Sequence, residues 1–464
     1  MQYTPAVEDF LNCLRRSGLV DDDETDGLIE PLALAGVDVG DVQQVAAALV
    51  KNETLTAWQA ENLLRGKRRG FLLGKYRLLS LLGRGGHSSV YVAEHSLMHR
   101  RCAIKILPAK NLGSSALARF QQEARAIAML AHTNIVRAYD LGQDKDGKTV
   151  IHFLVMELVE GESFDDRVTR DGPLPAVEAV NLIRQAADGL AHAHAAGVIH
   201  RDIKPANLLV DRQGVLKILD LGLAKMSTIL AADESAVFGT ADFLAPEQAL
   251  DAKKADARSD IYSLGCTFYV LLSGQAPFSG GTLSERLVRH IFETPEPLAN
   301  KRPELQPDLI SLVDRMLAKN PEERIQTCAE VSELLRNWLL KHADRQWLRD
   351  NPVLLGGGRG AVPNEPRAAD LATRQLTQPS RANPVPAPPL PVEVPRPSAN
   401  PTADAEHFIE IIALDGKPSA PVSTPGFLDS EEFQMPISPV TRQLMQDRPV
   451  VPAWKSWFRK IRGQ

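Results

Sequence analysis

The pattern of apolar and polar positions is helical at the start of the chain. Within residues 1–70, the i, i+3, i+4 and i+7 spacing of one helix face is followed by Val42, Val45, Ala46 and Leu49. Thr56 and Gln59 then form a T-x-x-Q capping box before the segment WQAENLLRG, and Gly66 is placed to end that helix. We therefore expect residues 1–70 to be a short helical appendage that packs or docks, rather than a catalytic unit.

The pattern changes at Tyr76. Three extended segments come first, KYRLLSLLG, CAIKIL and IHFLVMELV, and helical periodicity follows them. One helical stripe, which stops at Gly197, consists of Val180, Ile183, Ala187 and Leu190. A strand-rich first part and a helix-rich second part predict an α+β, two-lobed domain over residues 76–340.

The character of the chain changes again after residue 350. Most of its 32 prolines lie there, including the stretch NPVPAPPLPVEVPRP, which is unsuited to packing a core. We expect residues 350–450 to be a Pro-rich linker or tail, mostly disordered. A basic amphipathic helix is predicted over residues 451–464, because one helical face there carries Trp454, Trp457, Phe458 and Ile461. That helix would contact a membrane surface or a partner protein, or else pack back on its own domain.

Charge and cysteine usage narrow the function classes. The formal net charge of -5 gives no global basic field, so we expect no nucleic acid partner. The cysteines are far apart and fit neither a metal-ligand spacing nor a dense disulfide framework; they are Cys13, Cys102, Cys266 and Cys328. No signal-peptide pattern is seen, and no apolar run reaches the roughly 18 residues that span a bilayer. These features predict a reduced, cytoplasmic protein that is at most peripherally attached to a membrane.

The stretch LGRGGHSSVY, residues 82–91, looks like a phosphate-binding glycine loop in which Ser88 stands at the third glycine. Alone, it is more typical of a hairpin turn. Lys105 follows in CAIKIL, where a lysine is either a solvated edge charge or a point charge for nucleotide phosphates. The second role needs a carboxylate partner. Glu123 is the candidate, because it lies on the apolar face of the helical segment ALARFQQEARAIAML and is costly there unless paired.

The stretch VIHRDIKPANLLV, residues 198–210, carries the groups that phosphoryl transfer needs. That reaction uses a carboxylate to orient a hydroxyl and accept its proton, and oxygen ligands for Mg²⁺ bridging the phosphates. Asp202, Lys204 and Asn207 lie close together here, and Asp220 follows in LKILDLGLAK at the end of a predicted strand. Aspartates are also common in ordinary turns. Two such loops in this order and at this spacing favour the catalytic interpretation.

With these motifs in order, residues 76–340 resemble a eukaryotic-type (Hanks-type) Ser/Thr protein kinase domain, of the bacterial kind. The resemblance implies that Asp202 accepts the proton of the substrate hydroxyl and that Lys204 lies near the transferred phosphate. It also implies that Asn207 and Asp220 are the two Mg²⁺ ligands.

The same resemblance assigns an ATP site to the strand-rich part. Lys105 would contact the ATP phosphates, with Glu123 as its partner on a helix. The glycine-rich loop over the phosphates would consist of Leu82, Gly83, Arg84, Gly85, Gly86, His87, Ser88, Ser89 and Val90.

Further matches concern the framework around the site. Ala245-Pro246-Glu247 resembles the end of a kinase activation segment, and its glutamate would pair with Arg324. Asp260 would brace the catalytic loop from a buried helix. Met156 and the following ELVEG resemble the gatekeeper and the hinge that reads adenine, and Arg201 resembles the arginine that meets a phosphorylated activation segment.

Two positions depart from the family pattern. Ser88 in place of glycine should stiffen the tip of the loop slightly, and weaker ATP affinity is the expected consequence. Leu221 stands where the family usually has phenylalanine in its D-F-G triplet, which should shift the balance of active and inactive states without affecting metal binding. His192 and His194 precede the catalytic loop, and we interpret them as packing or surface histidines rather than metal ligands.

The resemblance implies a kinase that uses ATP and Mg²⁺ to phosphorylate protein Ser and Thr hydroxyls, including its own, in signalling. Lys204 and Thr240 are typical of the Ser/Thr class. The candidate phosphorylation sites in the activation segment are Ser227, Thr228, Ser235 and Thr240. The alternative is a pseudokinase scaffold that binds ATP and docks partner proteins. Such scaffolds typically lose the catalytic Asp, the metal-binding Asp or the strand Lys, and this chain retains all three.

Overall fold

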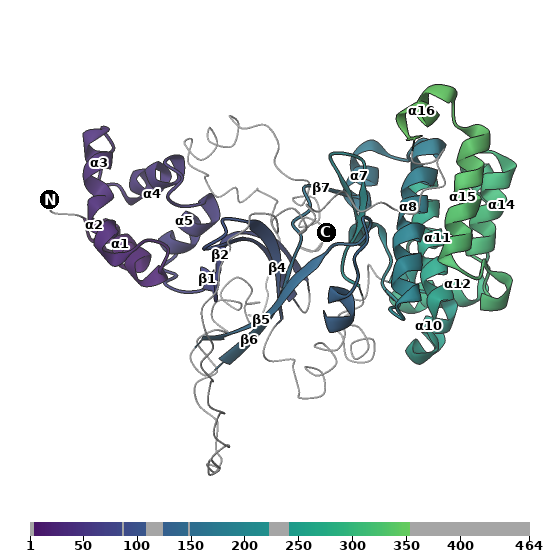
Figure 1. Cartoon of the computed structure of the whole chain (residues 1–464), viewed down its shortest axis with the longest axis horizontal. Helices are drawn as coiled ribbons and strands as arrows, with labels where there is room; N and C mark the ends of the chain where they lie inside the picture. Colours follow the sequence, from purple (N-terminus) through teal and green to yellow (C-terminus); the bar gives the residue numbers. More distant parts are fainter. Residues whose placement is uncertain (1–3, 86–87, 108–123, 147–148, 222–240, 353–464) are drawn as a thin grey trace, which may run out of the picture.

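The computed structural model describes residues 4–85, 88–107, 124–146, 149–221 and 241–352. The Pro-rich tail and the predicted helix at residues 451–464 therefore lie outside the described residues. The chain forms, in order, a group of short helices, a lobe built on an antiparallel sheet and a helical lobe (Figure 1). The expected α+β, two-lobed architecture is confirmed.

The first group comprises α1 (Pro5–Ser17), α2 (Asp22–Gly27), α3 (Ile29–Leu34), α4 (Val42–Lys51) and α5 (Ala57–Leu64). These helices, which we call the appendage, enclose a core of their own with Leu14, Ile29, Leu49 and Phe71 among its members. The predicted capping box is confirmed at the start of α5, where the Thr56 hydroxyl and the Gln59 side chain each accept a bond from the other's backbone N–H.

The strand-rich lobe is a six-stranded sheet with the order β1-β2-β3-β4-β6-β5, antiparallel throughout. Its strands are β1 (Leu72–Leu73), β2 (Tyr76–Gly85), β3 (Ser88–His95), β4 (Arg101–Leu107), β5 (Ala138–Asp146) and β6 (Thr149–Met156). The sheet curls, so that its two edges meet. The Gly74 N–H donates to Asp144 Oδ2 at 2.7 Å, and Lys75 Nζ lies 3.1 Å from Asp140 Oδ2. β4 lies in the interior of the sheet, because β3 pairs with one of its edges and β6 with the other.

The helical lobe begins with a small sheet and a long helix. β7 (Gly161–Ser163), β8 (Leu208–Asp211) and β9 (Leu216–Ile218) form the sheet, and the first helices are α7 (Phe164–Asp171) and α8 (Ala176–Ala195). The later helices are α10 (Pro246–Leu250), α11 (Ala257–Ser273), α12 (Leu283–Phe292), α13 (Leu298–Lys301), α14 (Pro307–Met316), α15 (Cys328–His342) and α16 (Arg345–Asp350).

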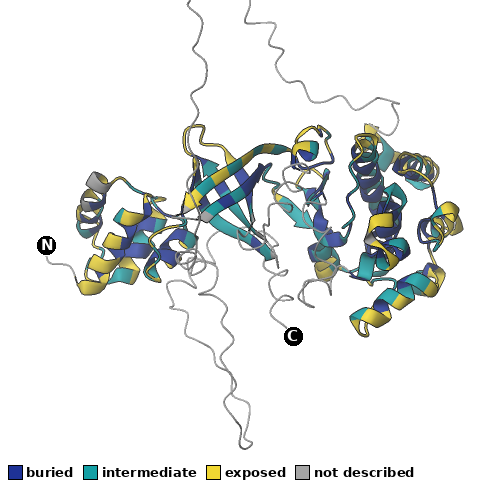
Figure 2. Ribbon diagram, turned by 90° about the horizontal axis from the view of Figure 1, so that it is seen from below, coloured by how far each residue is buried: buried dark blue, intermediate teal, exposed yellow. Residues whose placement is uncertain are grey.

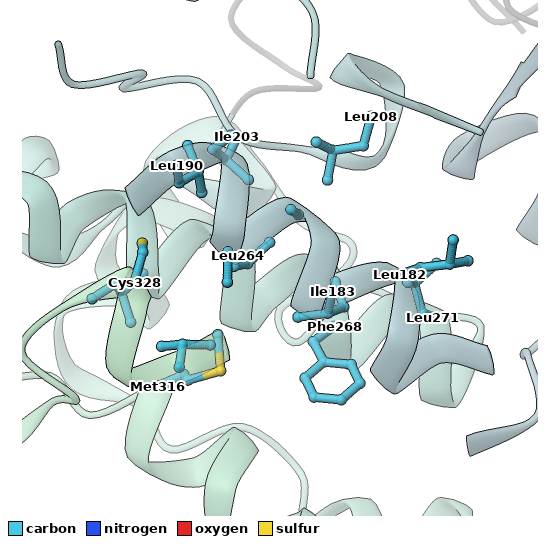
Figure 3. Close-up of a cluster of buried hydrophobic side chains, with 14 of the residues drawn as sticks. Leu182, Ile183, Leu190, Ile203, Leu208, Leu264, Phe268, Leu271, Met316 and Cys328 are labelled. Atoms are coloured by element: carbon cyan, nitrogen blue, oxygen red, sulfur yellow. The ribbon is translucent and has the colours of Figure 1, made fainter. Parts of the chain in front are cut away.

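The core of the helical lobe lies between α8, α11 and their neighbours (Figure 3). The predicted stripe on α8 is confirmed, since Val180, Ile183, Ala187 and Leu190 are all fully buried. α11 is buried at every position from Ser259 to Leu272, as expected of a helix enclosed on all sides. Helices such as α1, α4 and α14 are instead divided into a buried inner face and an exposed outer face (Figure 2).

The four cysteines are buried free thiols. Burial raises the pKa of the Cys102 thiol to about 11, which keeps it protonated at neutral pH. Among the helices in the described ranges, none combines the length and the apolar character needed to cross a bilayer.

Candidate active site

The loop between α8 and β8 is held through its backbone by Asp260 of α11. This carboxylate, which is 1% exposed, accepts the backbone N–H of His200 at 2.8 Å and that of Arg201 at 2.7 Å. His194 Nε2 lies 2.7 Å from the same carboxylate. Arg201 has a φ of 64°, a left-handed backbone conformation that a non-glycine residue adopts only when its surroundings fix it. The predicted bracing role of Asp260 is confirmed.

His200 connects this loop to the segment after β9 that carries Asp220. Its Nε2 lies 2.7 Å from the carbonyl oxygen of Leu219, and because a carbonyl only accepts, Nε2 carries the proton. Its Nδ1 then accepts the backbone N–H of Asp202 at 3.2 Å. The fully buried imidazole therefore sets the backbone of Asp202 against the residue before Asp220.

The structure brings three of the predicted residues together around one carboxylate. Lys204 Nζ lies 3.2 Å from Asp202 Oδ2, and Asn207 Nδ2 donates to the Asp202 carbonyl at 2.8 Å and to Oδ2 at 3.1 Å. Asn207 belongs to a short 3₁₀ turn, Pro205–Asn207, and its backbone carbonyl accepts the N–H of Leu219 at 2.9 Å. These bonds fix the side chain of Asp202 in one orientation.

Lys105 and Asp220 form an ion pair across the two lobes. Lys105 projects from the interior strand β4, is 8% exposed and places Nζ 2.7 Å from Asp220 Oδ1. Burial raises the pKa of the Asp220 carboxyl, as does the nearby charge of Asp202, but the Lys105 ammonium lowers it by more. The pKa of Asp220 therefore lies below its ordinary value, and the group is ionised at neutral pH.

This burial excludes the interpretation of Lys105 as a solvated edge charge. Its predicted partner, Glu123, lies outside the described residues, while Ala124 and Ile127 just beyond it are buried in a helical segment. Asp220 has a φ of 53°, so its backbone also adopts the left-handed conformation. Asp202 and Asp220 lie near enough for the negative charge of Asp202 to raise the pKa of Asp220.

The glycine-rich stretch, residues 82–91, lies in the paired ends of β2 and β3, which we call the glycine hairpin. Gly83 pairs with Val90, Arg84 with Ser89 and Gly85 with Ser88. Gly86 and His87, between them, lie outside the described residues. Ser88 is thus the first residue of β3 and directly follows these two residues. Its expected effect on the stiffness of the loop stays a prediction.

An apolar surface lies between this hairpin and the end of β6. Ala103, Val136 and Met156 are buried in one cluster, against which Leu82 and Val90 are packed. The flanking members of the cluster are Leu158, Val159 and Leu219. The sequence interpretation missed Ala103 and Val136. Alternation along β4 could have identified Ala103, because residues two apart share a face and Lys105 was already assigned to the site.

A cavity of about 20 Å³ continues behind Met156. Its walls are apolar except for Asp220, and Leu221 forms part of them. A space of this size holds about one water molecule. Leu221, the residue in place of the usual phenylalanine, is itself buried where it lines this cavity.

A second ion pair, not predicted from the sequence, joins the hinge to β9. Lys217 Nζ lies 2.7 Å from Glu157 Oε1, and Glu157 Oε2 accepts the backbone N–H of Arg137 at 3.2 Å. Glu157 directly follows Met156, and Lys217 lies three residues before Asp220. The hinge and the strand leading to Asp220 are therefore held at a fixed separation.

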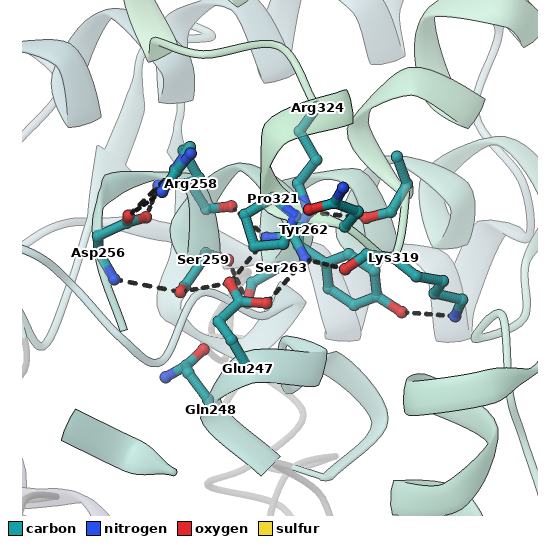
Figure 4. Close-up of polar contacts among 12 residues, drawn as sticks. Glu247, Gln248, Asp256, Arg258, Ser259, Tyr262, Ser263, Lys319, Pro321 and Arg324 are labelled. Carbon is teal, nitrogen blue, oxygen red and sulfur yellow. Dashed lines mark hydrogen bonds and ion pairs between the residues drawn. The ribbon is translucent and has the colours of Figure 1, made fainter. Parts of the chain in front are cut away.

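The predicted pair of Glu247 and Arg324 is confirmed (Figure 4). Two bonds of 2.7 Å join the guanidinium to both carboxylate oxygens, and the Arg324 side chain is fully buried. Ser259 Oγ donates a third bond to Glu247 at 2.6 Å. The pair fixes the start of α10 against α11 and the loop before α15. The four candidate phosphorylation sites, Ser227, Thr228, Ser235 and Thr240, lie outside the described residues.

The site fits a nucleotide bound with a divalent metal ion. The apolar surface suits a flat base, and Lys105 supplies a buried cation for phosphate oxygens. Asn207 uses its amide nitrogen on Asp202, so its amide oxygen is the atom suited to a metal, together with the ionised Asp220. Amide and carboxylate oxygens are the ligands that Mg²⁺ prefers.

Comparisons with known proteins agree with this geometry. The family described as "Protein kinase domain" matches residues 76–337. The chain is 38% identical over 269 residues to the serine/threonine-protein kinase PknB of Mycobacterium leprae. The aligned residues make up 57% of this chain and 43% of that protein. This chain is 36% identical over 272 residues to the serine/threonine-protein kinase PrkC of Bacillus subtilis, covering 58% and 41%.

The chain thus spans less than half the length of these relatives. The match of the family covers more than half of this chain and includes both loops that carry Asp202 and Asp220. The chain belongs to the protein kinase domain family.

Proposed function

We propose that this chain is an ATP-dependent protein kinase that transfers the γ-phosphate of ATP to Ser and Thr hydroxyls of proteins. The observation that carries the proposal is the joint placement of Asp202 with Lys204 and Asn207, facing the ion pair of Asp220 and Lys105. The printed names of the relatives, serine/threonine-protein kinases, support the same class of acceptor.

In this proposal Asp202 orients the acceptor hydroxyl and takes its proton. Its carboxylate is already held by Lys204 and Asn207, and its backbone by His200, so the base needs little reorganisation when a substrate arrives. Lys204 would also lie beside the transferred phosphate and offset its negative charge. Lys105 would bind phosphate oxygens while keeping Asp220 ionised.

Asn207 and Asp220 would hold Mg²⁺ through oxygen atoms. A bound Mg²⁺ neutralises phosphate charge and orients the phosphates for in-line transfer. Ser88 and Ser89 would lie beside the phosphates near the turn of the hairpin, and Met156 with the hinge would face the adenine. Weaker ATP affinity stays the expectation for a serine at position 88.

Activation would involve the segment before Ala245. Arg201 lies at the catalytic loop in a fixed left-handed conformation, and a cation at this position suits a phosphorylated Ser or Thr of residues 222–240. Phosphorylation of that segment by a second molecule of the same enzyme is the simplest route. Phosphopeptide mapping of protein incubated with ATP tests this, with the Asp202→Asn variant as the unlabelled reference.

The decisive experiment compares the full chain with Asp202→Asn. Purified protein with Mg²⁺ and labelled ATP should label itself or a generic basic protein, and the variant should lose at least about 100-fold of this activity. Asp171→Asn, an exposed aspartate of α7, is the control and should retain activity. Equal labelling by wild type and Asp202→Asn contradicts the assignment of the base.

The scaffold alternative makes the opposite prediction for the wild type. A pseudokinase would bind ATP, shown by a rise in melting temperature with nucleotide, and would transfer no phosphate to any protein.

Peripheral membrane contact through residues 451–464 is a separate proposal that rests on sequence alone. Co-sedimentation with anionic liposomes should fall when residues 450–464 are removed, and unchanged co-sedimentation excludes this contact.

A further inference from the structure

The appendage is seated on the outer face of the glycine hairpin, at an irregular point of β2. The ladder between β2 and β3 shifts register between Leu78 and Ser80, and Leu79 has no opposite residue in β3. Thr56 Oγ1 donates to the Leu79 carbonyl at 2.5 Å, and Gln59 Nε2 donates to the Leu78 carbonyl at 2.7 Å. The two carbonyls at the bulge are therefore bonded by α5.

Gln59 has two roles in this contact. Its Oε1 accepts the backbone N–H of Thr56 at 2.9 Å and closes the capping box, while its Nε2 bonds to β2. The side chain is fully buried. A third bond runs in the opposite direction, from Arg77 Nη2 to the Thr54 carbonyl at 2.8 Å. The start of α5 and the bulge of β2 thus form one continuous hydrogen-bonded unit.

Trp58 extends the contact to β3. Its ring packs edge-on against Tyr91, with centroids 5.7 Å apart, and against Phe71 at 5.8 Å. Tyr91 directly follows Val90, and neighbouring strand residues point to opposite faces of a sheet. Val90 is packed in the apolar surface of the site. Trp58 therefore packs on the face of β3 opposite to the face that borders the nucleotide site.

A bulge bends a strand and interrupts its ladder, so the bonds from Thr56 and Gln59 supplement the ladder where β2 bends. A second register shift lies between Leu81 and Gly83, just before the glycines. We propose that Trp58 and Gln59 are positioning residues for nucleotide binding, which hold the glycine hairpin from its outer face. This inference rests on the proposed function, and it gives the appendage, which lies outside the matched residues 76–337, a part in that function.

Such coupling is reciprocal: if the appendage favours nucleotide binding, nucleotide must steady the appendage by the same free energy. A role limited to holding the protein together predicts neither effect. The two effects can be measured separately, one by kinetics and one by hydrogen exchange.

The kinetic test uses Trp58→Ala in the full chain. The apparent KM for ATP should rise about 3- to 10-fold, while kcat stays within about twofold, because an aromatic contact of ordinary strength is lost. Trp58→Phe keeps an edge-on ring and should restore KM to within about twofold. Trp347→Ala removes a partly buried tryptophan from the helical lobe and is the matched control. It should leave KM unchanged.

The reciprocal test is hydrogen exchange with a non-hydrolysable ATP analogue and Mg²⁺. Amides of α5 should exchange more slowly with the analogue in the wild type, and this protection should disappear in Trp58→Ala. The measurement does not depend on catalytic turnover, so it remains informative if Trp58→Ala is partly destabilised.

The outcomes separate the two proposals. If the wild type binds the analogue but α5 shows no protection, or if Trp58→Ala leaves KM unchanged, the positioning role is wrong while the kinase assignment stands. A fall in kcat with KM unchanged also overturns it. If the wild type does not bind the analogue, the proposed function fails and the inference fails with it.

Discussion

The two lobes hold their parts of the site by different means. In the helical lobe, the catalytic loop and the end of the activation segment are anchored by buried charges, Asp260 in one case and the pair of Glu247 and Arg324 in the other. In the strand-rich lobe, the glycine hairpin is held by its backbone ladder, by apolar contacts and by neutral bonds from α5.

This difference has an energetic consequence. Separating a buried charge from its partner costs much free energy, so arrangements of the helical lobe with such a pair broken are rarely populated. Asp202, the proposed base, is therefore held in position before a substrate binds. Neutral bonds and ring contacts are each worth roughly 1 kcal/mol, so the hairpin can adjust to a ligand. Lys105 and Asp220 form the junction, because they place one charge from each lobe in direct contact.

The largest effect should come from the anchor of the activation segment. Arg324→Met leaves Glu247 buried without its cation and should lower the free energy of unfolding by about 3–5 kcal/mol. Arg315→Met, which breaks a half-exposed pair with Glu330, should cost less than about 1 kcal/mol in the same denaturant titration. Equal costs for the two variants would show that burial does not distinguish these pairs.

The pH dependence of that anchor follows from Glu247. Burial raises the pKa of its carboxyl, but the bonds from Arg324 and Ser259 lower it by more, and the net pKa lies below the ordinary value of 4.5. The stabilisation is therefore complete above about pH 4.5 and is lost as the pH falls through the folded-state pKa. The difference between wild type and Arg324→Met should shrink over that range.

The junction between the lobes should give the next largest effect. Lys105→Met should reduce kcat/KM by about 100-fold or more, because it removes a preorganised charge from the phosphate site. It also removes the group that lowers the pKa of Asp220, so the acid limb of the remaining activity should move to higher pH. Lys75→Met, an exposed lysine paired with Asp140, is the control. An unmoved acid limb would contradict the coupling of Lys105 to Asp220.

The brace of the catalytic loop should matter for both stability and rate. Asp260→Asn keeps the shape but turns an amide N–H toward a backbone donor, so we expect a loss of about 2–3 kcal/mol. Because His200 and Arg201 orient Asp202, kcat should fall more than the apparent affinity for ATP changes. Thr267→Ala, on the same buried helix, removes a hydroxyl bonded within its own helix and should leave kcat unchanged. A normal kcat in Asp260→Asn would show that the brace does not position the base.

The smallest effect is expected at the cavity behind Met156. Leu221→Phe should fill this space and raise the free energy of unfolding by about 0.5–1 kcal/mol. Leu264→Phe in the close-packed helical core should lower it by about 1–3 kcal/mol, which gives the opposite sign for the same substitution. Destabilisation by both would mean that the cavity is too rigid to accept the ring.

Local patterns in the sequence predicted the fold well. The capping box of Thr56 and Gln59 and the stripe on α8 depend on residues a few positions apart, and the helix period determines which of them meet. The catalytic loop was equally accessible, because Asp202, Lys204 and Asn207 lie within one short loop. Lys105 and Asp220 were recognised individually through the resemblance, but their contact spans 115 positions and no periodicity indicates it.

What the sequence did not indicate depends on strand register and on docking between elements. The motif of glycines left the register of the hairpin open, and the structure supplies it. The bond of Gln59 to Leu78 was also missed, because the capping box already accounted for this side chain. Glu157 and Lys217 could be identified only once the hinge and β9 were placed side by side.

The connection between the appendage and the sheet has a further consequence. Only residues 65–71 separate α5 from β1, and Phe71 already belongs to the core of the appendage. So short a tether gives the docking surface an effective concentration on the order of millimolar or higher. Contacts too weak to hold two separate molecules together can then keep α5 in place nearly all the time. Any competitor for the back of the hairpin would need to exceed that local concentration, whereas a cut in the tether would release the appendage by dilution alone.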